Sequence, residues 1–158
     1  MNRRNFIMGT GLSAIIIAAD QLVKHWLVVL MQSHPHEALA ITPFFNLVMV
    51  WNRGISFGMF AGDDARHILI GMTSVIVVAL CLWLWRATEK HIWVPLGLII
   101  GGATGNVIDR VRWGAVADFF DFHLAERHWP AFNVADSAIV VGVILLLWMS
   151  FFSKKPSA

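Results

Sequence analysis

The stretches Val116-Ala117-Asp118-Phe119 and Phe132-Asn133-Val134-Ala135-Asp136 lie in one short connection between two long apolar segments. The first stretch follows one apolar segment, and the second leads directly into the next. Each stretch carries an aspartate, Asp118 or Asp136. An ionisable group beside a membrane span is energetically costly and is usually functional. We therefore interpret the two carboxylates as candidates for one shared site that the rest of the chain would bring together.

The composition is typical of a membrane protein. Of the 158 residues, 58% are hydrophobic and only 14% are charged, whereas soluble domains are about half apolar and about a quarter charged. The formal net charge of +2 is small, and the Lys and Arg residues form no long run. A nucleic-acid-binding face is therefore not indicated. The length suits one compact domain.

Four apolar segments are predicted to cross the membrane as helices, at about residues 6–31, 66–86, 92–111 and 134–152. As a helix, the first would rise about 39 Å, which exceeds the roughly 30 Å of a hydrocarbon core. Arg3 and Arg4 ahead of it leave open a cleavable signal peptide. The helical pattern continues past Ala19 without Pro or Gly, which favours a membrane span. We expect residues 1–158 to form a single membrane-embedded domain.

Two segments, at about 32–65 and 112–133, are expected outside the hydrocarbon core. In the first, prolines interrupt a helix, and residues 46–51 are rich in β-branched and aromatic types. Asn52-Arg53-Gly54 is typical of a turn, and Ile55-Ser56-Phe57 follows it, so a short strand or hairpin is predicted. The second segment mixes aromatic with polar residues, which is typical of an interfacial segment.

The distribution of basic residues predicts the orientation. The basic residues of the two termini and of the turn after the second span would all lie on one side of the membrane. They are Arg3, Arg4, Arg86, Lys90, Lys154 and Lys155. The positive-inside rule places this side in the cytoplasm, with both termini. Asp118 and Asp136 then lie on the extracytoplasmic side, where polar groups of the first, third and fourth spans converge. A polar pocket at one mouth of a four-helix bundle is the simplest structure with this property.

The aspartate pair admits two interpretations. Two carboxylates at close range cannot both ionise cheaply, so the pair can hold an acid and a base around one water, as in aspartic proteases. Alternatively, both can be solvated or salt-bridged acids, because Asp is common near helix N-termini. Asn133 could cap a helix with Asp136 three residues later, which would also fix the direction of the carboxylate. Taken alone, the pair favours the ordinary structural interpretation.

Two further pairs have helical spacing. Asp20 and Lys24 are four residues apart, so they face the same way and would pair in lipid as structural support. Asn106 and Arg110 have the same spacing, and Arg110 could hold a carboxylate by a forked contact. Glycines spaced by four give the third span a smooth face for close helix packing. The seven histidines show no metal-ligand spacing, so neither a metal nor another cofactor is expected.

Five stretches together resemble the signature blocks of bacterial lipoprotein signal peptidase, or signal peptidase II, and they cover nearly the whole chain in order. They are Asp20-Gln21-Leu22-Val23-Lys24, Asn52-Arg53-Gly54-Ile55-Ser56-Phe57, Gly101-Gly102-Ala103-Thr104-Gly105-Asn106-Val107-Ile108-Asp109-Arg110, Val116-Ala117-Asp118-Phe119 and Phe132-Asn133-Val134-Ala135-Asp136.

The resemblance implies an aspartyl endopeptidase that removes signal peptides from prolipoproteins, just before a diacylglyceryl-modified cysteine, at the outer leaflet of the bacterial cytoplasmic (inner) membrane. It implies that Asp118 and Asp136 are catalytic and leaves open which is the acid. The residues that it implies as supporting or substrate-positioning are Asp20, Lys24, Asn52, Gly54, Asn106, Arg110 and Asn133.

The same resemblance implies the fold class and the partners. The expected protein is mainly α-helical and polytopic, with four transmembrane helices, a small extracytoplasmic β-sheet near residues 46–57 and a short interfacial helix within residues 118–130. Its partners would be prolipoproteins and membrane lipids, and no nucleic acid is expected. Globomycin-type compounds would inhibit it, and the expected oligomeric state is a monomer. A different class, a proton-coupled transporter or channel, would use the same intramembrane acids. It would require polar groups near the midplane and paired halves, which the sequence does not contain.

Overall fold

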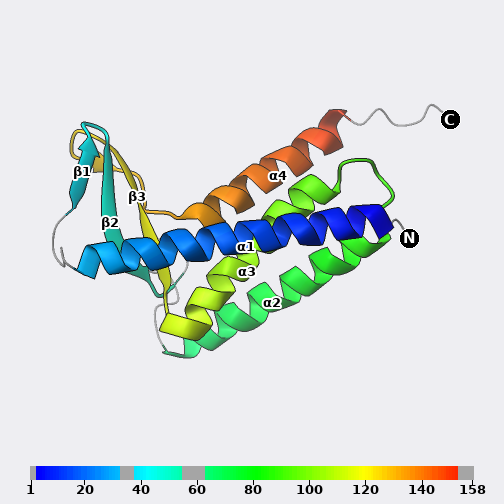
Figure 1. Ribbon diagram of the computed structural model, residues 1–158, viewed down its shortest axis with the longest axis horizontal. Helices are drawn as coiled ribbons and strands as arrows, with labels where there is room; N and C mark the ends of the chain where they lie inside the picture. The colour runs from blue at the N-terminus through cyan, green and yellow to red at the C-terminus, as the bar shows by residue number, and fades with distance from the viewer. Residues whose placement is uncertain (1–2, 33–37, 55–62, 153–158) are drawn as a thin grey trace.

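The computed structural model describes residues 3–32, 38–54 and 63–152. The helices are α1 (Arg3–Gln32), α2 (Asp63–Arg86), α3 (Trp93–Trp113) and α4 (Val134–Phe152). The strands are β1 (Leu39–Thr42), β2 (Phe45–Asn52), β3 (Val116–Leu124) and β4 (Arg127–His128), which form one antiparallel sheet in the order β1-β2-β3-β4. Figure 1 shows the sheet at one end of an elongated helical bundle, next to the end of α1 and the start of α4.

The helices occupy the four segments predicted to span the membrane. In the described part of the chain, α1, α4 and residues 66–86 of α2 are long and apolar enough to cross a membrane. Their large apolar side chains are widely exposed, including Ile15, Val75 and Ile144, as expected for surfaces that contact lipid. The beginning of α1 and the end of α4 lie at the end of the bundle away from the sheet (Figure 1).

Helix α3 carries polar residues near its end, and two of them, Asn106 and Asp109, are buried where the helix packs against its neighbours. Its glycines let two neighbours approach closely. A Cβ on Gly101 would lie 2.9 Å from the carbonyl oxygen of Ser13 in α1, and a Cβ on Gly102 would clash with the carbonyl oxygen of Ala135 in α4. The smooth glycine face predicted from the sequence therefore packs against α1, and Gly102 adds a second contact surface against α4.

The polar segment before α4 differs from the prediction. The short interfacial helix expected within residues 118–130 is not found there, because β3 and β4 occupy this segment. β3 pairs with β2, opposing Phe122 to Phe45 and Phe120 to Leu47, so its backbone groups are satisfied by a neighbouring strand and a local helix is not required. The strand predicted at residues 46–51 is confirmed as part of β2, but its hairpin partner is β1, before it in the chain, with the turn at residues 43–44. The expected continuation after Asn52-Arg53-Gly54, Ile55-Ser56-Phe57, lies outside the described residues.

The close approach of α3 and α4 predicts the effect of a single methyl group. Gly102→Ala should lower the free energy of unfolding by about 1–3 kcal/mol, because the added Cβ meets a backbone carbonyl and the Ile139 side chain. Thermal unfolding in detergent micelles, followed by circular dichroism, measures the change. Gly71→Ala is the matched control, since a Cβ there meets nothing within 4 Å. Equal melting temperatures for the two variants would contradict the tight α3–α4 contact.

Candidate active site

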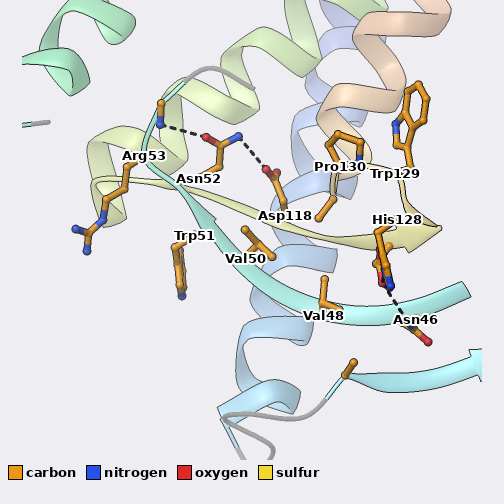
Figure 2. A pocket seen from close by; sticks show the side chains of 14 residues that line it. Asn46, Val48, Val50, Trp51, Asn52, Arg53, Asp118, His128, Trp129 and Pro130 are labelled. Carbon is orange, nitrogen blue, oxygen red and sulfur yellow. Dashed lines mark hydrogen bonds and ion pairs between the residues drawn. The ribbon is translucent and has the colours of Figure 1, made fainter. Parts of the chain in front are cut away.

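Asp118 lies on β3 and is almost completely buried, with 2% of its surface exposed. Two side-chain amides hold its carboxylate. Nδ2 of Asn52, at the end of β2, donates to Oδ2 at 3.1 Å, and Nδ2 of Asn133 donates to Oδ1 at 2.6 Å. Figure 2 shows the first contact at the wall of a cavity. The carboxylate is therefore held from two directions by neutral donors.

Asp136 lies in the first turn of α4, where Asn133 caps the helix. The backbone N–H of Asp136 donates to Oδ1 of Asn133 at 2.9 Å, and the backbone N–H of Asn133 donates back to Oδ2 of Asp136 at 3.3 Å. This reciprocal pair is a capping box with Asp in place of Glu. Nδ2 of Asn106, on α3, donates to the other carboxylate oxygen at 2.7 Å. The cap predicted from the sequence is present, and it fixes the direction of this carboxylate.

Asn133 brings the two aspartates into one site, because its side chain bonds Asp118 while its backbone and Oδ1 bond Asp136. The electrostatics reflect this proximity. Burial raises the pKa of Asp118 to about 6, and the negative charge of Asp136 adds to the rise. The hydrogen bonds from Asn52 and Asn133 oppose it. Asp118 can therefore keep a proton at a higher pH than an ordinary aspartate does.

A fully buried ion cluster lies beneath the aspartates. Nζ of Lys24 lies 2.9 Å from Oδ2 of Asp20 and 2.7 Å from Oδ2 of Asp109, and all three side chains have no exposed surface. Nζ also donates to Oδ1 of Asn106 at 3.1 Å, and Nε2 of Gln21 donates to Oδ1 of Asp109 at 2.8 Å. The sequence prediction that Asp20 and Lys24 pair is confirmed, and their cluster includes a third charge.

The ion cluster contacts both elements that carry the candidate aspartates. Oδ1 of Asp20 accepts the backbone N–H of Ala135, one residue before Asp136, at 2.9 Å. Oδ2 of Asp109 accepts the backbone N–H of Ala117, one residue before Asp118, at 3.3 Å. Each of these two acids therefore holds the backbone beside one candidate catalytic side chain.

The sequence did not single out Asp109 as a site residue, although a signal was present. Asp109 follows Gly105 by four residues, which places it on the same helix face as the glycines that pack against α1. An acid on a face that is closed by another helix must be paired. Lys24, on α1, was therefore a predictable partner.

Arg110 makes contacts other than those expected. The sequence suggested that it could hold a carboxylate by a forked contact, but its Nη2 donates to the carbonyl oxygen of Gly54 at 3.2 Å and its Nη1 to that of Asn106 at 3.4 Å. The N–H of Gly54 in turn donates to Oδ1 of Asn52 at 3.1 Å. Arg110 therefore supports the turn that presents Asn52 to Asp118. Its positive charge also interacts electrostatically with the carboxyl groups of Asp118 and Asp136.

A cavity of about 830 Å³ opens beside Asp118 (Figure 2). Asn52, Gly54 and Asp118 contribute to its wall, and Val48 and Val50 contribute apolar surface. Among residues 3–32, 38–54 and 63–152, no group of three or more His, Cys, Asp or Glu side chains could hold a metal ion. An acid with a raised pKa in the cavity wall, linked through Asn133 to a second acid, is suited to acid–base chemistry on a molecule in the cavity.

Comparison with known proteins gives a consistent result. The family model described as signal peptidase (SPase) II matches residues 12–152. The lipoprotein signal peptidase of Methylocella silvestris is 43% identical over 151 residues, covering 94% of this chain and 88% of the relative. That of Nitrobacter hamburgensis is 45% identical over 157 residues, covering 94% and 95%. A bacterial membrane enzyme solved in meso at 2.3 Å superposes with a TM-score of 0.78 and 26% identity, covering 95% of this chain and 93% of the other.

The buried ion cluster predicts a stability defect for Lys24→Ala. Removal of the lysine leaves Asp20 and Asp109 without their cation, which should cost about 3–5 kcal/mol and lower the amount of folded protein. The melting temperature and the monodisperse yield in detergent measure the effect. Lys90→Ala, at an exposed position, should stay within about 0.5 kcal/mol of the native protein. A Lys24→Ala protein that folds normally but does not cleave its substrate would rule out this structural role.

Proposed function

Because the chain belongs to the signal peptidase II family, whose members remove signal peptides from prolipoproteins, we propose that it cuts as an aspartic endopeptidase with Asp118 and Asp136 as its catalytic pair. The cleaved bond precedes a cysteine that carries diacylglycerol. The observation that carries this proposal is the bridge through Asn133, which contacts both carboxyl groups. The transporter alternative gains no support from the relatives.

The environments of the two carboxyls support different roles. Asp136 accepts hydrogen bonds from Asn106 and from the Asn133 backbone at a helix N-terminus, an arrangement that suits a carboxylate. Asp118 is buried on a strand, and its raised pKa favours the protonated form. We therefore assign Asp136 as the general base and Asp118 as the general acid in the first step.

The reaction then follows from these protonation states. Asp136 takes a proton from a water molecule, whose oxygen attacks the scissile carbonyl carbon while Asp118 donates its proton to the carbonyl oxygen. The proton on Asp136 next passes to the amide nitrogen, the carbon–nitrogen bond breaks, and a hydroxyl proton of the intermediate returns to Asp118. The products are the carboxyl group of the signal peptide and the free amine of the modified cysteine.

The supporting residues would act by positioning. Asn52, Asn106 and Asn133 hold the carboxyls, while Arg110 supports the turn at Gly54. Asp20 and Lys24 belong to the buried cluster that fixes the backbone beside the pair. Fixed geometry of this kind lowers the entropic part of the barrier.

The proposed setting is the bacterial inner membrane, with residues 1–158 as one membrane-embedded peptidase domain. The sheet and the aspartates would lie on the extracytoplasmic side, and both termini in the cytoplasm. This orientation is supported by Arg86, the last residue of α2, and by Lys90 in the turn that follows. The end of α2 lies at the end of the bundle away from the sheet (Figure 1). Membrane lipids would surround a monomer, and globomycin-type compounds would inhibit it.

Loss of either carboxylate should abolish cleavage without unfolding the protein. Asp118→Asn and Asp136→Asn each keep the shape of the side chain but remove the proton exchange, so cleavage of a lipidated precursor should fall by about 10²-fold or more. Cleavage in detergent is measured by the shift in precursor mass, and melting curves verify folding. Glu126→Gln, at an exposed turn position, is the control and should cleave normally. Native rates in either Asn variant would remove that residue from the mechanism.

The pKa of Asp118 predicts a pH dependence. The acid must be protonated, so kcat/KM of the native enzyme should decline as the pH rises through about 6, where Asp118 ionises. The Asn52 hydrogen bond stabilises the ionised form. Asn52→Ala removes it and should move the decline upward by about 0.5–1 pH unit. Glu126→Gln should leave the profile in place, and a downward shift in Asn52→Ala would contradict the assignment of Asp118 as the acid.

A further inference from the structure

A second polar group lies in the cavity that contains Asp118. The cavity wall includes Asn46 on β2, Asp121 on β3 and His128 on β4. Figure 2 shows Asn46 and His128 toward one end of β2 and Asn52 with Asp118 toward the other, with Val48 and Val50 between them. The proposed catalysis makes no use of this second group.

A β-bulge places Asp121 in the same cavity as Asp118. Residues three apart on a regular strand point to opposite faces. The register with β2 shifts between Leu47 and Val50, where β2 has one residue more than β3, so that Val50 opposes Asp118 and Asn46 opposes Asp121. At the other edge of β3, the N–H groups of Phe119 and Phe120 both donate to the carbonyl oxygen of Phe132, at 3.1 and 2.8 Å. This bulge breaks the alternation of β3 between the two acids. The two acids thereby line one cavity. At about 3.3 Å per residue, the three steps from Asp118 to Asp121 on β3 and the four steps from Val50 to Asn46 on β2 correspond to about 10–13 Å.

The imidazole of His128 is held firmly although it is half exposed. Its Nδ1 lies 2.9 Å from both carboxylate oxygens of the buried Asp121, and 51% of the histidine side chain is exposed. Nδ2 of Asn46 donates to Oδ2 of Asp121 at 3.1 Å. The ring of His123 stacks on that of His128, with centroids 4.9 Å apart and an interplanar angle of 20°. Three strands therefore fix the orientation of one ring.

This arrangement determines which nitrogen of His128 can contact a ligand. Burial raises the pKa of Asp121, but the hydrogen bonds from His128 and Asn46 outweigh it and leave the pKa below its usual value. Asp121 is then ionised and can only accept, so the proton of the neutral ring lies on Nδ1. Nε2 is left as a hydrogen-bond acceptor on the exposed side chain.

We propose that Nε2 of His128 accepts a hydrogen bond from a main-chain N–H of the mature segment of the prolipoprotein, three or four residues after the cleaved bond. This inference rests on the proposed function. An extended chain whose reacting bond lies at Asp118 reaches Asn46 and His128 after about 10–13 Å, or three to four residues. Val48 and Val50 supply an apolar floor beneath it.

The direction of the bound chain follows from the chemistry of the two halves of the substrate. The signal peptide is apolar, and the lipid on the cysteine enters the membrane, so both leave the site toward the hydrocarbon. The mature segment is polar and must leave through water. The polar end of the cavity, formed by Asn46, Asp121 and His128, suits this segment.

Two isosteric variants separate substrate contact from structural support. In His128→Asn, the side-chain amide replaces Nδ1 and keeps the contact with Asp121, but nothing replaces Nε2. In His128→Gln, the longer side chain reaches the Nε2 position and loses the contact with Asp121. A purely structural role predicts that Asn preserves function and Gln impairs it. Substrate contact predicts the opposite order.

The measurement is steady-state cleavage of a synthetic diacylglyceryl precursor peptide in detergent, with melting curves for each variant. His128→Asn should raise KM by about two- to tenfold with kcat nearly unchanged, and His128→Gln should lie closer to the native enzyme. Proline at the third or fourth residue after the cleaved bond, counting the modified cysteine as the first, removes the N–H. It should raise KM by a similar factor for the native enzyme and add little in His128→Asn.

The outcomes distinguish the two proposals. If the native enzyme cleaves the precursor but His128→Asn has native KM on every peptide, the contact with His128 is refuted. The same conclusion follows if His128→Asn and the proline peptides act additively, or if only the melting temperature changes. If the native enzyme cleaves no lipidated precursor, the proposed function itself fails, and binding of the uncleaved peptide to the two variants then decides the contact independently.

Discussion

The buried cation of Lys24 is the constraint on which the rest of the structure depends. A charge without exposed surface inside a helical bundle must be neutralised by the protein itself, and Asp20 and Asp109 do so at 2.9 and 2.7 Å. Both acids also accept backbone N–H groups, one from Ala135 and one from Ala117. The neutralisation of one lysine therefore fixes four elements at once, namely α1, α3, β3 and the start of α4.

Close packing of α1 on α3 is what makes this ion cluster possible. A Cβ at Gly105 would lie 2.7 Å from Oδ2 of Asp20, in the space that the carboxylate needs to reach Lys24. The glycines of α3 thus do more than form one smooth face for α1. At Gly105 the missing side chain leaves room for a charged group, and at Gly102 it lets α4 approach with its capped N-terminus.

Much of this architecture could be predicted because it depends on local patterns. The apolar runs predict the helices, and the spacing of Asn133 and Asp136 predicts the cap. The strand β3 could not be predicted from its own residues, because its conformation depends on pairing with β2, which is distant in sequence. The same reason explains Arg110: helical spacing gave its direction, but only tertiary structure places the carbonyl of Gly54 within its reach. Asp109 was predictable from its helix face, whereas the bulge that turns Asp121 into the cavity was not.

The difference between β3 and an interfacial helix matters for the chemistry. If both aspartates lay in first turns of helices, both would benefit from the helix dipole and both would favour ionisation. Here Asp136 lies at a helix N-terminus, while Asp118 lies on a buried strand with only neutral amide donors in direct contact. Burial and the charge of Asp136 then favour a proton on Asp118. Two residues of one chemical type thereby lie in different environments because they lie on different kinds of secondary structure, and Asn133 links them without contributing a charge of its own.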